Sequence, residues 1–289
     1  MPPPPLGPVT AGNALKITSP KANDSFFMTD DAKLPSILLT TNLPGKPHSW
    51  QWTIEWKTFK KSGSATSFSN TFDIKASIEN LGGTLTVKAV SGTSSAQVVV
   101  KVRGKQCTEA GVTAYLATKA NSGGFNKILK HESKMKHFDA EGEPIKSFDN
   151  GYGVCQLTSP APTYEQAWSW KKNIDAGMTL FSTKRSAAVT YLTQGGRTAT
   201  EAQIQREAIC RWNGGAYHVW VAGKWVRDSN MLCDTATGNI GWDMTDARNA
   251  GKTEATLRQR DKASYAGGRK SGDPWKYSGV CYADRIMGS

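Results

Sequence analysis

The sequence predicts a two-domain β + α protein, with a β-sandwich over residues 14–104 followed by a mostly α-helical domain over residues 105–289. In the first half, short runs alternate apolar and polar residues and are separated by turn-forming clusters, which is typical of sandwich strands. In the second half, apolar residues recur with the spacing of one helix face. The length of 289 residues suits two domains of ordinary size. The proline-rich residues 1–13 predict an extended, flexible tail.

The first half contains five runs with strand patterning. They are residues 34–41, 50–56, 72–76, 84–90 and 96–102, with turn signals at 42–45, 61–64 and 91–94. Trp50, Trp52 and Trp56 fall on one face of the second run, and we expect them to pack in a core rather than to form a sugar-stacking platform. Residues 81–87 resemble the late strands of bacterial immunoglobulin-like modules, which implies an immunoglobulin-like sandwich.

The second half shows helical spacing over three segments, residues 108–130 with a break at 121–124, residues 163–183 and residues 201–211. Thr163 precedes its segment as an N-cap, and residues 198–201 predict another helix start. Residues 139–152 and 213–242 lack this spacing. We therefore expect two loops there.

The net charge of the chain indicates which kinds of molecule it can bind. Thirty-six Lys and Arg against 24 Asp and Glu give +12, which favours nucleic acid, an anionic membrane or a bacterial wall. No dense basic block with interleaved aromatic residues appears, so nucleic acid is not an expected partner. No apolar run is long enough for an integral membrane segment. The first residues lack the basic and apolar regions of a secretory signal, which predicts synthesis in the cytoplasm without a signal peptide.

The five cysteines, Cys107, Cys155, Cys210, Cys233 and Cys281, contain no C-x-x-C pair. A zinc ribbon or a thioredoxin-like site is therefore not expected. Two disulfides with Cys155 as a buried thiol form one arrangement, and five reduced thiols form the other. Histidine spacing near residues 131–137 does not match a metal site either, so neither a metal nor another cofactor is expected.

The pair Glu132-Ser133 carries the main chemical signal. It ends a predicted helix whose apolar face includes Phe125, Ile128 and Leu129. Glycosidic bond cleavage needs a carboxylic acid that is protonated near neutral pH, and an apolar, partly dry cleft provides such a setting for a glutamate. Ser133 could orient the carboxyl group.

Glu132-Ser133 is followed in order by segments that together resemble soluble lytic transglycosylases and goose-type lysozymes. The segments are Asn150-Gly151-Tyr152-Gly153-Val154-Cys155-Gln156, Asn173-Ile174-Asp175-Ala176-Gly177 and Trp212-Asn213-Gly214-Gly215. The resemblance covers about residues 108–220 and implies a lysozyme-like domain in which Glu132 is the catalytic acid/base. It places Ser133, Tyr152, Gly153, Gln156, Trp212 and Asn213 at the substrate. The segment 173–177 is expected to be structural.

The sequence departs from the family pattern at two points. Cys155 stands where the family usually has Met, and Trp212 replaces a Tyr whose phenol hydroxyl usually lies near the catalytic carboxyl group. A hydrolase also needs a second carboxylate. Candidates in the loop are Asp139, Glu141, Glu143 and Asp149. Asp149 is counted among the substrate-binding residues because it could position water, but a solvated loop acid is the favoured interpretation.

Because lytic transglycosylases need only one carboxyl group, the sequence favours cleavage of the β-1,4 MurNAc–GlcNAc bond of peptidoglycan by transglycosylation. A lysozyme-type muramidase, a chitinase on the same fold and a non-enzymatic wall-binding or spike component are the alternatives. The expected partners are peptidoglycan glycan strands, an inhibitor or immunity protein, and a phage or secretion-system delivery component. Such an enzyme acts at the cell wall or in the periplasm after delivery.

Overall fold

The structure is a computed structural model that describes residues 14–148 and 150–288. The chain divides into two compact units. The first unit comprises Met1–Val112 with Lys136–Asn173, and the second comprises Thr113–Met135 with Ile174–Ser289. Each unit therefore contains two separate stretches of the chain. The predicted domain boundary after residue 104 stays a prediction.

The predicted fold class is wrong. The protein has a mixed composition of about 31% helix and 27% strand with several small sheets, and it is not a clear immunoglobulin-like sandwich followed by a mostly helical domain. In the described part of the second unit, β9 to β13 form two separate small sheets among the helices. The prediction failed there because these strands are only three or four residues long, and a few alternating residues give a weak signal until the partner strand is in place.

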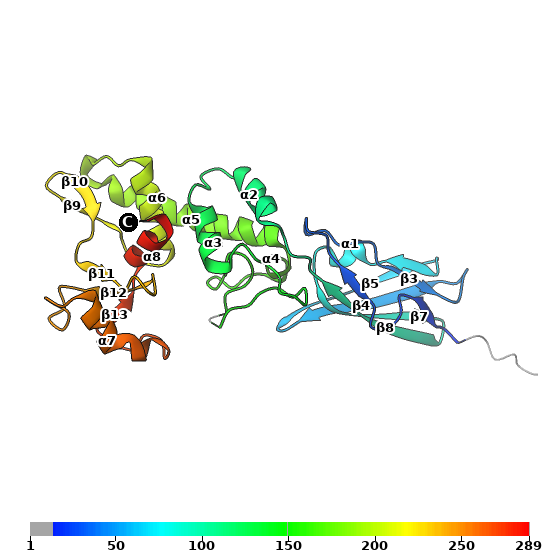
Figure 1. The fold of residues 1–289 in the computed structure, drawn as a ribbon. Helices are drawn as coiled ribbons and strands as arrows, with labels where there is room; N and C mark the ends of the chain where they lie inside the picture. Colours follow the sequence, from blue (N-terminus) through cyan, green and yellow to red (C-terminus); the bar gives the residue numbers. More distant parts are fainter. Residues whose placement is uncertain (1–13, 149, 289) are drawn as a thin grey trace, which may run out of the picture. The chain divides into compact units, whose positions relative to one another are not determined.

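The first unit contains a five-stranded and a three-stranded sheet (Figure 1). The five-stranded sheet has the order β2 (Ser25–Phe27), β8 (Ser94–Arg103), β7 (Gly83–Ser91), β4 (His48–Trp56) and β5 (Phe59–Ser67). The three-stranded sheet has the order β1 (Ile17–Ser19), β3 (Leu38–Thr41) and β6 (Thr71–Asp73). β2 runs parallel to β8, and the other pairs are antiparallel.

The two sheets share one core. Trp50, Trp52 and Trp56 are buried in it, because β4 alternates inward and outward side chains along its whole length. The prediction that these tryptophans pack in a core is confirmed. Leu39 of β3 and Val87 of β7 belong to the same cluster, so residues from both sheets exclude water from it.

Two strand predictions differ from the structure for identifiable reasons. β5 replaces the turn expected at residues 61–64; its sequence is mostly polar, and it forms because it pairs with β4 over its full length. The expected strand 72–76 ends at Asp73, and α1 (Lys75–Ile78) follows. The Asp73 carboxylate accepts hydrogen bonds from the backbone N–H groups of Ile37 and Lys75, at 3.2 and 3.0 Å, which favours the change from strand to helix.

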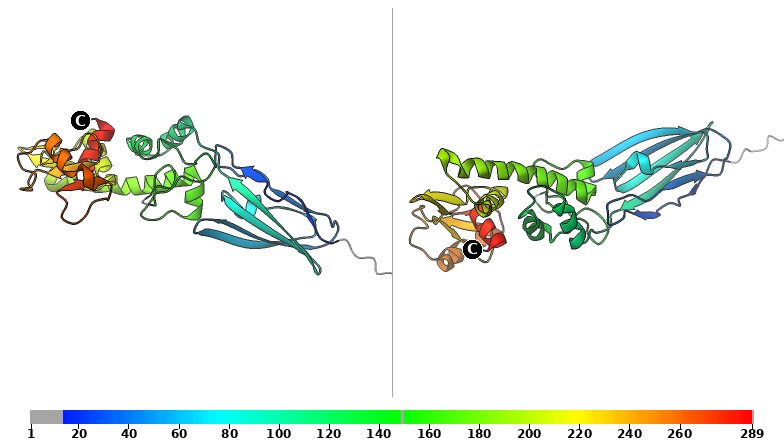
Figure 2. Two further views of the ribbon diagram at one scale, coloured as in Figure 1. Left: turned by 60° about the horizontal axis from the view of Figure 1, so that its bottom comes forward. Right: turned by 90° about the horizontal axis from the view of Figure 1, so that it is seen from above.

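The helix starts predicted in the second half are confirmed. Thr163 caps α4 (Tyr164–Trp168) and Thr200 caps α6 (Glu201–Trp212). In each case the threonine hydroxyl accepts from the N–H of the third helix residue, a glutamine, whose side-chain oxygen accepts from the threonine N–H. The break expected at 121–124 separates α2 (Glu109–Ala117) from α3 (Phe125–Ser133). α5 (Trp170–Leu192) is one continuous helix, drawn in green in Figure 2. Its residues 170–173 are assigned to the first unit and the rest to the second.

The second unit places short strands between its helices. The elements after α5 that have not yet been named are η1 (Gln194–Gly196), β9 (His218–Val221), β10 (Lys224–Arg227), β11 (Met231–Cys233), β12 (Ile240–Asp243), α7 (Glu254–Tyr265), β13 (Trp275–Tyr277) and α8 (Gly279–Met287). The loop predicted at 213–242 is therefore wrong. Its hairpin β9–β10, with Ala222 and Gly223 as a two-residue turn between runs containing Trp220 and Trp225, was recognisable from the sequence.

A single disulfide is present among the five cysteines. Cys233 at the end of β11 is bonded to Cys281 in α8, and Cys107, Cys155 and Cys210 are buried thiols. This pattern differs from both arrangements considered from the sequence, although Cys155 is a buried thiol as expected. Burial raises the pKa of Cys107 to about 11 and raises the pKa of Cys210 as well, so both thiols stay protonated near neutral pH.

Across residues 14–148 and 150–288, none of the helices combines the length and the apolar character needed to cross a membrane.

Candidate active site

Glu132 lies in the last turn of α3, at the boundary between the core of the second unit and its surface. Phe125, Ile128 and Leu129 on the same helix are fully buried. Lys134 adopts a left-handed conformation and ends the helix, since its N–H bonds back to the carbonyl groups of the last turn. The Glu132 side chain is half-buried. It is thus attached to a rigid helix and still reachable from solvent.

A tyrosine far away in the sequence holds the Glu132 carboxyl group. The hydroxyl of Tyr282, in α8, donates a hydrogen bond to Oε1 of Glu132. Tyr282 is only 2% exposed. Burial first, then the negative charge of Glu132 and the hydrogen bond to it, raise the pKa of Tyr282 far above its ordinary value. The phenol therefore remains a proton-bearing donor at neutral pH.

The second carboxyl oxygen of Glu132 is differently placed. Within the described residues, Oε2 accepts no hydrogen bond, whereas Oε1 is held by the phenol. The ring of His131 meets the Tyr282 ring edge to face, with centroids 5.2 Å apart and planes at 90°. His131 is exposed, so this contact covers the tyrosine from the solvent side. One carboxyl oxygen is fixed and the other is available for proton transfer.

Helix α8 begins close to the end of α6 because its first residue is a glycine. A Cβ at Gly279 would lie 2.1 Å from the carbonyl oxygen of Gly214 and 2.2 Å from that of Cys210. Only glycine permits this approach of α8 to the end of α6. The N–H of Gly279 also donates to the Gly214 carbonyl at 3.1 Å. Tyr282 then follows within one turn of the helix.

The predicted cleft residues Trp212 and Asn213 lie in the same unit as Glu132. Trp212 is half-buried, and its ring contacts Phe125 of α3 and Phe181 of α5, with centroids 5.4 and 6.4 Å apart. Asn213 ends α6, with its N–H bonded to the Cys210 carbonyl at 3.2 Å. Trp212 therefore packs on the helix that carries Glu132.

Ser133 has a local structural contact. Its hydroxyl donates to the Leu129 carbonyl one turn earlier, at 3.1 Å. Such a bond is common for serine in a helix and fixes the hydroxyl against its own backbone. The predicted role of Ser133 in orienting the carboxyl group stays a prediction.

The glycine-rich turn 150–156 lies in the first unit and is packed inward. A Cβ at Gly153, which has φ +70°, would lie 2.5 Å from the His137 ring and 2.8 Å from the Asn173 amide nitrogen. The buried Asn173 amide accepts from the Cys155 N–H at 2.9 Å and donates to the Tyr152 carbonyl at 3.1 Å. Gly153 is required here by close packing, and Asn173 clamps the turn.

The two remaining residues of the turn have different surroundings. Tyr152 is buried, and its ring lies 6.0 Å from that of Trp56 and 5.9 Å from that of Phe59, so it belongs to the core of the first unit. Gln156 is half-buried, and its amide donates to the Gly153 carbonyl at 2.7 Å. Asp149 lies outside the described residues.

Two of the other candidate second carboxylates, Glu143 and Asp139, have structural contacts. Glu143 forms an ion pair with Arg103 and accepts from the Trp56 indole at 3.0 Å. These two bonds oppose the effect of burial, and the net result is that the pKa of Glu143 lies below its ordinary value. The Asp139 carboxylate accepts from the backbone N–H groups of Glu141 and Glu143. Glu143 and Asp139 stabilise the loop.

The predicted site residues are divided between the two units. Glu132, Ser133, Trp212 and Asn213 belong to the second unit, whereas Tyr152, Gly153 and Gln156 belong to the first. Tyr282, the partner of Glu132, was missed. It lies 150 positions away in a segment outside the family resemblance, and only the packing of α8 brings the two together.

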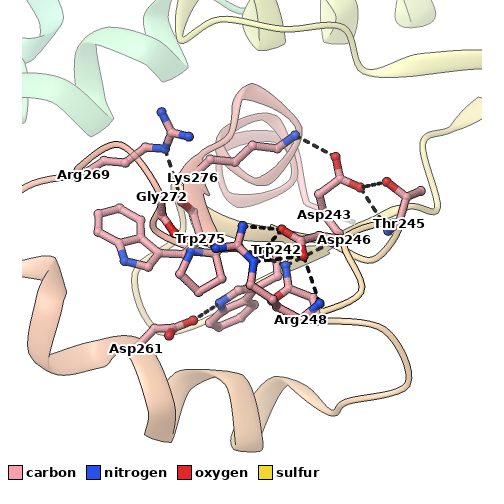
Figure 3. Close-up of polar contacts among 12 residues, drawn as sticks. Trp242, Asp243, Thr245, Asp246, Arg248, Asp261, Arg269, Gly272, Trp275 and Lys276 are labelled. Atoms are coloured by element: carbon pink, nitrogen blue, oxygen red, sulfur yellow. Dashed lines mark hydrogen bonds and ion pairs between the residues drawn. The ribbon is translucent and has the colours of Figure 1, made fainter.

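A separate polar hollow of about 390 Å³ lies among β12, β13 and the neighbouring loops of the second unit (Figure 3). Two of its three acidic groups, Asp243 and Asp246, are ion-paired, and Asp273 accepts from the Lys270 backbone N–H at 2.6 Å. Asp246 forms a two-pronged contact with Arg248, which holds the pKa of the carboxyl at about 2, and Asp243 pairs with Lys276 at 3.1 Å. Arg269 bonds the Trp275 carbonyl through Nε. These ion pairs and hydrogen bonds hold the loops that border the hollow in place.

Among the described residues, no group of three or more His, Cys, Asp or Glu side chains is placed to hold a metal ion. Comparison of the chain with known protein families, with curated proteins and with solved structures finds no match.

Proposed function

We propose that the protein is a peptidoglycan-degrading glycosidase that cleaves the β-1,4 MurNAc–GlcNAc bond as a lytic transglycosylase. The observation that carries this proposal is the Glu132–Tyr282 pair, a half-buried carboxyl group with one oxygen held by a buried phenol. General acid–base catalysis needs such a positioned group with a site open for proton transfer. The ordered resemblance of the segments around Glu132 and Trp212 to soluble lytic transglycosylases supports the same reaction.

In the proposed first step, protonated Glu132 transfers its proton to the glycosidic oxygen while the bond from that oxygen to C1 of MurNAc breaks. The departing GlcNAc leaves with a free 4-hydroxyl group, and positive charge develops at C1. The Glu132 carboxylate then removes the proton from the 6-hydroxyl of the same MurNAc, whose oxygen bonds to C1 and closes a 1,6-anhydro ring. Glu132 is protonated again, and no water is consumed.

Tyr282 acts on the carboxylate form in this scheme. A hydrogen bond from a neutral donor to an ionised acceptor is stronger than one between neutral groups, so the phenol stabilises negative charge on Oε1. Because the phenol occupies Oε1, proton transfer is directed to Oε2. The Tyr282 hydroxyl thus positions the Glu132 carboxyl group. It also stabilises the carboxylate that acts as the base in the second step.

Replacing Tyr282 by Phe is expected to lower kcat for wall cleavage by about ten- to a hundred-fold, because one charge-assisted hydrogen bond of about 1.5–3 kcal/mol is lost. The ring and its packing remain, so the melting temperature should change little. Clearing of a purified peptidoglycan suspension gives the rate. Tyr277→Phe, which alters a half-exposed tyrosine of β13, is the matched control. An unchanged rate for Tyr282→Phe would show that the Tyr282 hydroxyl has no role in the proposed reaction.

The positive net charge suits the proposed substrate. With +12 charges on 289 residues, the protein is attracted to an anionic wall, and this attraction weakens as salt screens it. We place its action at the cell wall or in the periplasm, reached by phage or secretion-system delivery.

The proposal is tested by mass spectrometry of the muropeptides that the full chain releases from purified peptidoglycan. Products ending in 1,6-anhydro-MurNAc are expected, each 18 mass units (about one water) lighter than the hydrolysed counterpart, because the ring closes without water. Products with reducing ends would identify a muramidase instead. If no muropeptides appear under any redox condition, the enzymatic function is wrong, and a wall-binding role would remain.

A further inference from the structure

Two neighbouring residues of α8 connect it to different parts of the second unit. Cys281 is bonded through its sulfur to Cys233 of β11, and Tyr282 donates its hydrogen bond to Glu132 of α3. Successive positions on an α-helix point about 100° apart. The two bonds therefore hold α8 from two sides, and a rotation or a slide of this helix would move both.

The other contacts that fix α8 are non-covalent and connect it to β10, to Tyr217 and to the end of α6. The Asp284 carboxylate pairs with Arg227 of β10 at 2.8 Å and accepts from the Tyr217 hydroxyl at 2.6 Å. Gly279 bonds the Gly214 carbonyl at the end of α6. These contacts keep α8 in the fold when the disulfide is open. The disulfide is the covalent restraint next to the residue that holds Glu132.

We propose that the Cys233–Cys281 disulfide controls the Glu132–Tyr282 pair by its redox state. The disulfide holds α8 in the position in which Tyr282 donates to Glu132, and only the oxidised protein keeps this position. The role in activity rests on the proposed function, and the effect on α8 does not. Thiols are kept reduced in the cytoplasm, whereas disulfides persist in the periplasm and outside the cell. In a wall-cleaving enzyme with this control, the Glu132–Tyr282 hydrogen bond is disrupted in the reducing cytoplasm, where the protein is made. It forms in the oxidising compartment that contains the substrate.

The redox step is an ordinary thiol–disulfide exchange. The two thiols of Cys233 and Cys281 lose two protons and two electrons and form one S–S bond, while the disulfide of an oxidised partner, such as oxidised glutathione, is reduced to two thiols. A dithiol reductant drives the reverse exchange. Burial raises the pKa of Cys107 and of Cys210, so these two thiols form little thiolate and exchange slowly.

The test compares the full chain with and without dithiothreitol, at matched pH and temperature. Thiol titration under denaturing conditions should rise from three to five free thiols among the five cysteines. Hydrogen–deuterium exchange of residues 279–287 should increase at least ten-fold, and wall clearing should fall at least ten-fold. Both should return after oxidation with oxidised glutathione. The double variant Cys233→Ala/Cys281→Ala should resemble the reduced wild type and should not respond to dithiothreitol, whereas Cys155→Ala should respond as the wild type does.

The outcomes separate the redox control from the proposed function. Faster exchange of α8 on reduction, together with no wall cleavage by the oxidised protein, would support the control of α8 and overturn the function. Unchanged exchange and activity with five free thiols would overturn the control and leave the function standing. Loss of far-ultraviolet circular dichroism on reduction would also overturn it, because the disulfide would then stabilise the whole unit rather than set one helix.

Discussion

Glu132→Gln is expected to lower the release of soluble muropeptides at least a thousand-fold. Glutamine has nearly the same shape as glutamic acid and can still accept the Tyr282 hydrogen bond, but it can neither give a proton to the glycosidic oxygen nor take one from the 6-hydroxyl. Both halves of the proposed reaction use the same carboxyl group, so the variant loses acid and base together. Chromatography of the products over several hours measures the residual rate.

The matched control for this variant is Glu79→Gln. Glu79 is an exposed residue of the first unit, and its replacement makes the same change of charge. It should retain the wild-type rate. Circular dichroism and the melting temperature should be the same for both variants, because Glu132 is only half-buried. A Glu132→Gln protein that clears peptidoglycan as fast as the control would exclude Glu132 as the catalytic group.

A large effect on stability is expected at acidic pH, from His137. This ring is fully buried, and the Val154 N–H donates to its Nδ1 at 3.1 Å, which requires a neutral imidazole. Burial lowers its pKa from 6.5 to about 3. Below pH 6.5 His137 binds a proton in the unfolded chain but stays neutral in the folded protein. The free energy of unfolding therefore falls as pH falls. The loss should be about 3 kcal/mol at pH 4.5 and about 5 kcal/mol once the pH is below 3.

Urea unfolding followed by tryptophan fluorescence at pH 7.0 and 4.5 checks this expectation. His137→Gln should unfold at lower urea at pH 7.0, because a packed ring is lost, but its free energy of unfolding should change much less between the two pH values. His131→Gln alters an exposed histidine and should keep the wild-type pH dependence. Equal pH dependence in the wild type and in His137→Gln would show that other groups cause the acid effect.

Some structural features followed directly from local sequence. Thr163 and Thr200 begin their helices because a threonine hydroxyl can accept from the exposed N–H groups of a first turn, a property that needs no distant partner. Trp50 and Trp52 face the core because side chains in a strand alternate. Glu132 at the end of an amphipathic helix was recognised in the same way.

Other features depended on partners that the sequence does not place. β5 is polar and forms by pairing with β4, and β11 to β13 are too short to be recognised before they pair with one another. The predicted fold class failed on such elements. At Gly153 the missing Cβ makes room for His137 and Asn173, a contact that the motif did not indicate. The predicted role of Gly153 at the substrate stays a prediction.

The helix starts, the alternation of the long strands, the basic charge and the presence of a glutamate at a helix end could all be predicted from the sequence. These properties depend on residues within a few positions of one another or on composition alone. The hydrogen bond from Tyr282 to Glu132 and the disulfide between Cys233 and Cys281 became visible only in the folded protein. Both contacts require α8 to pack against elements that are distant in the chain, and local periodicity contains no information about such packing.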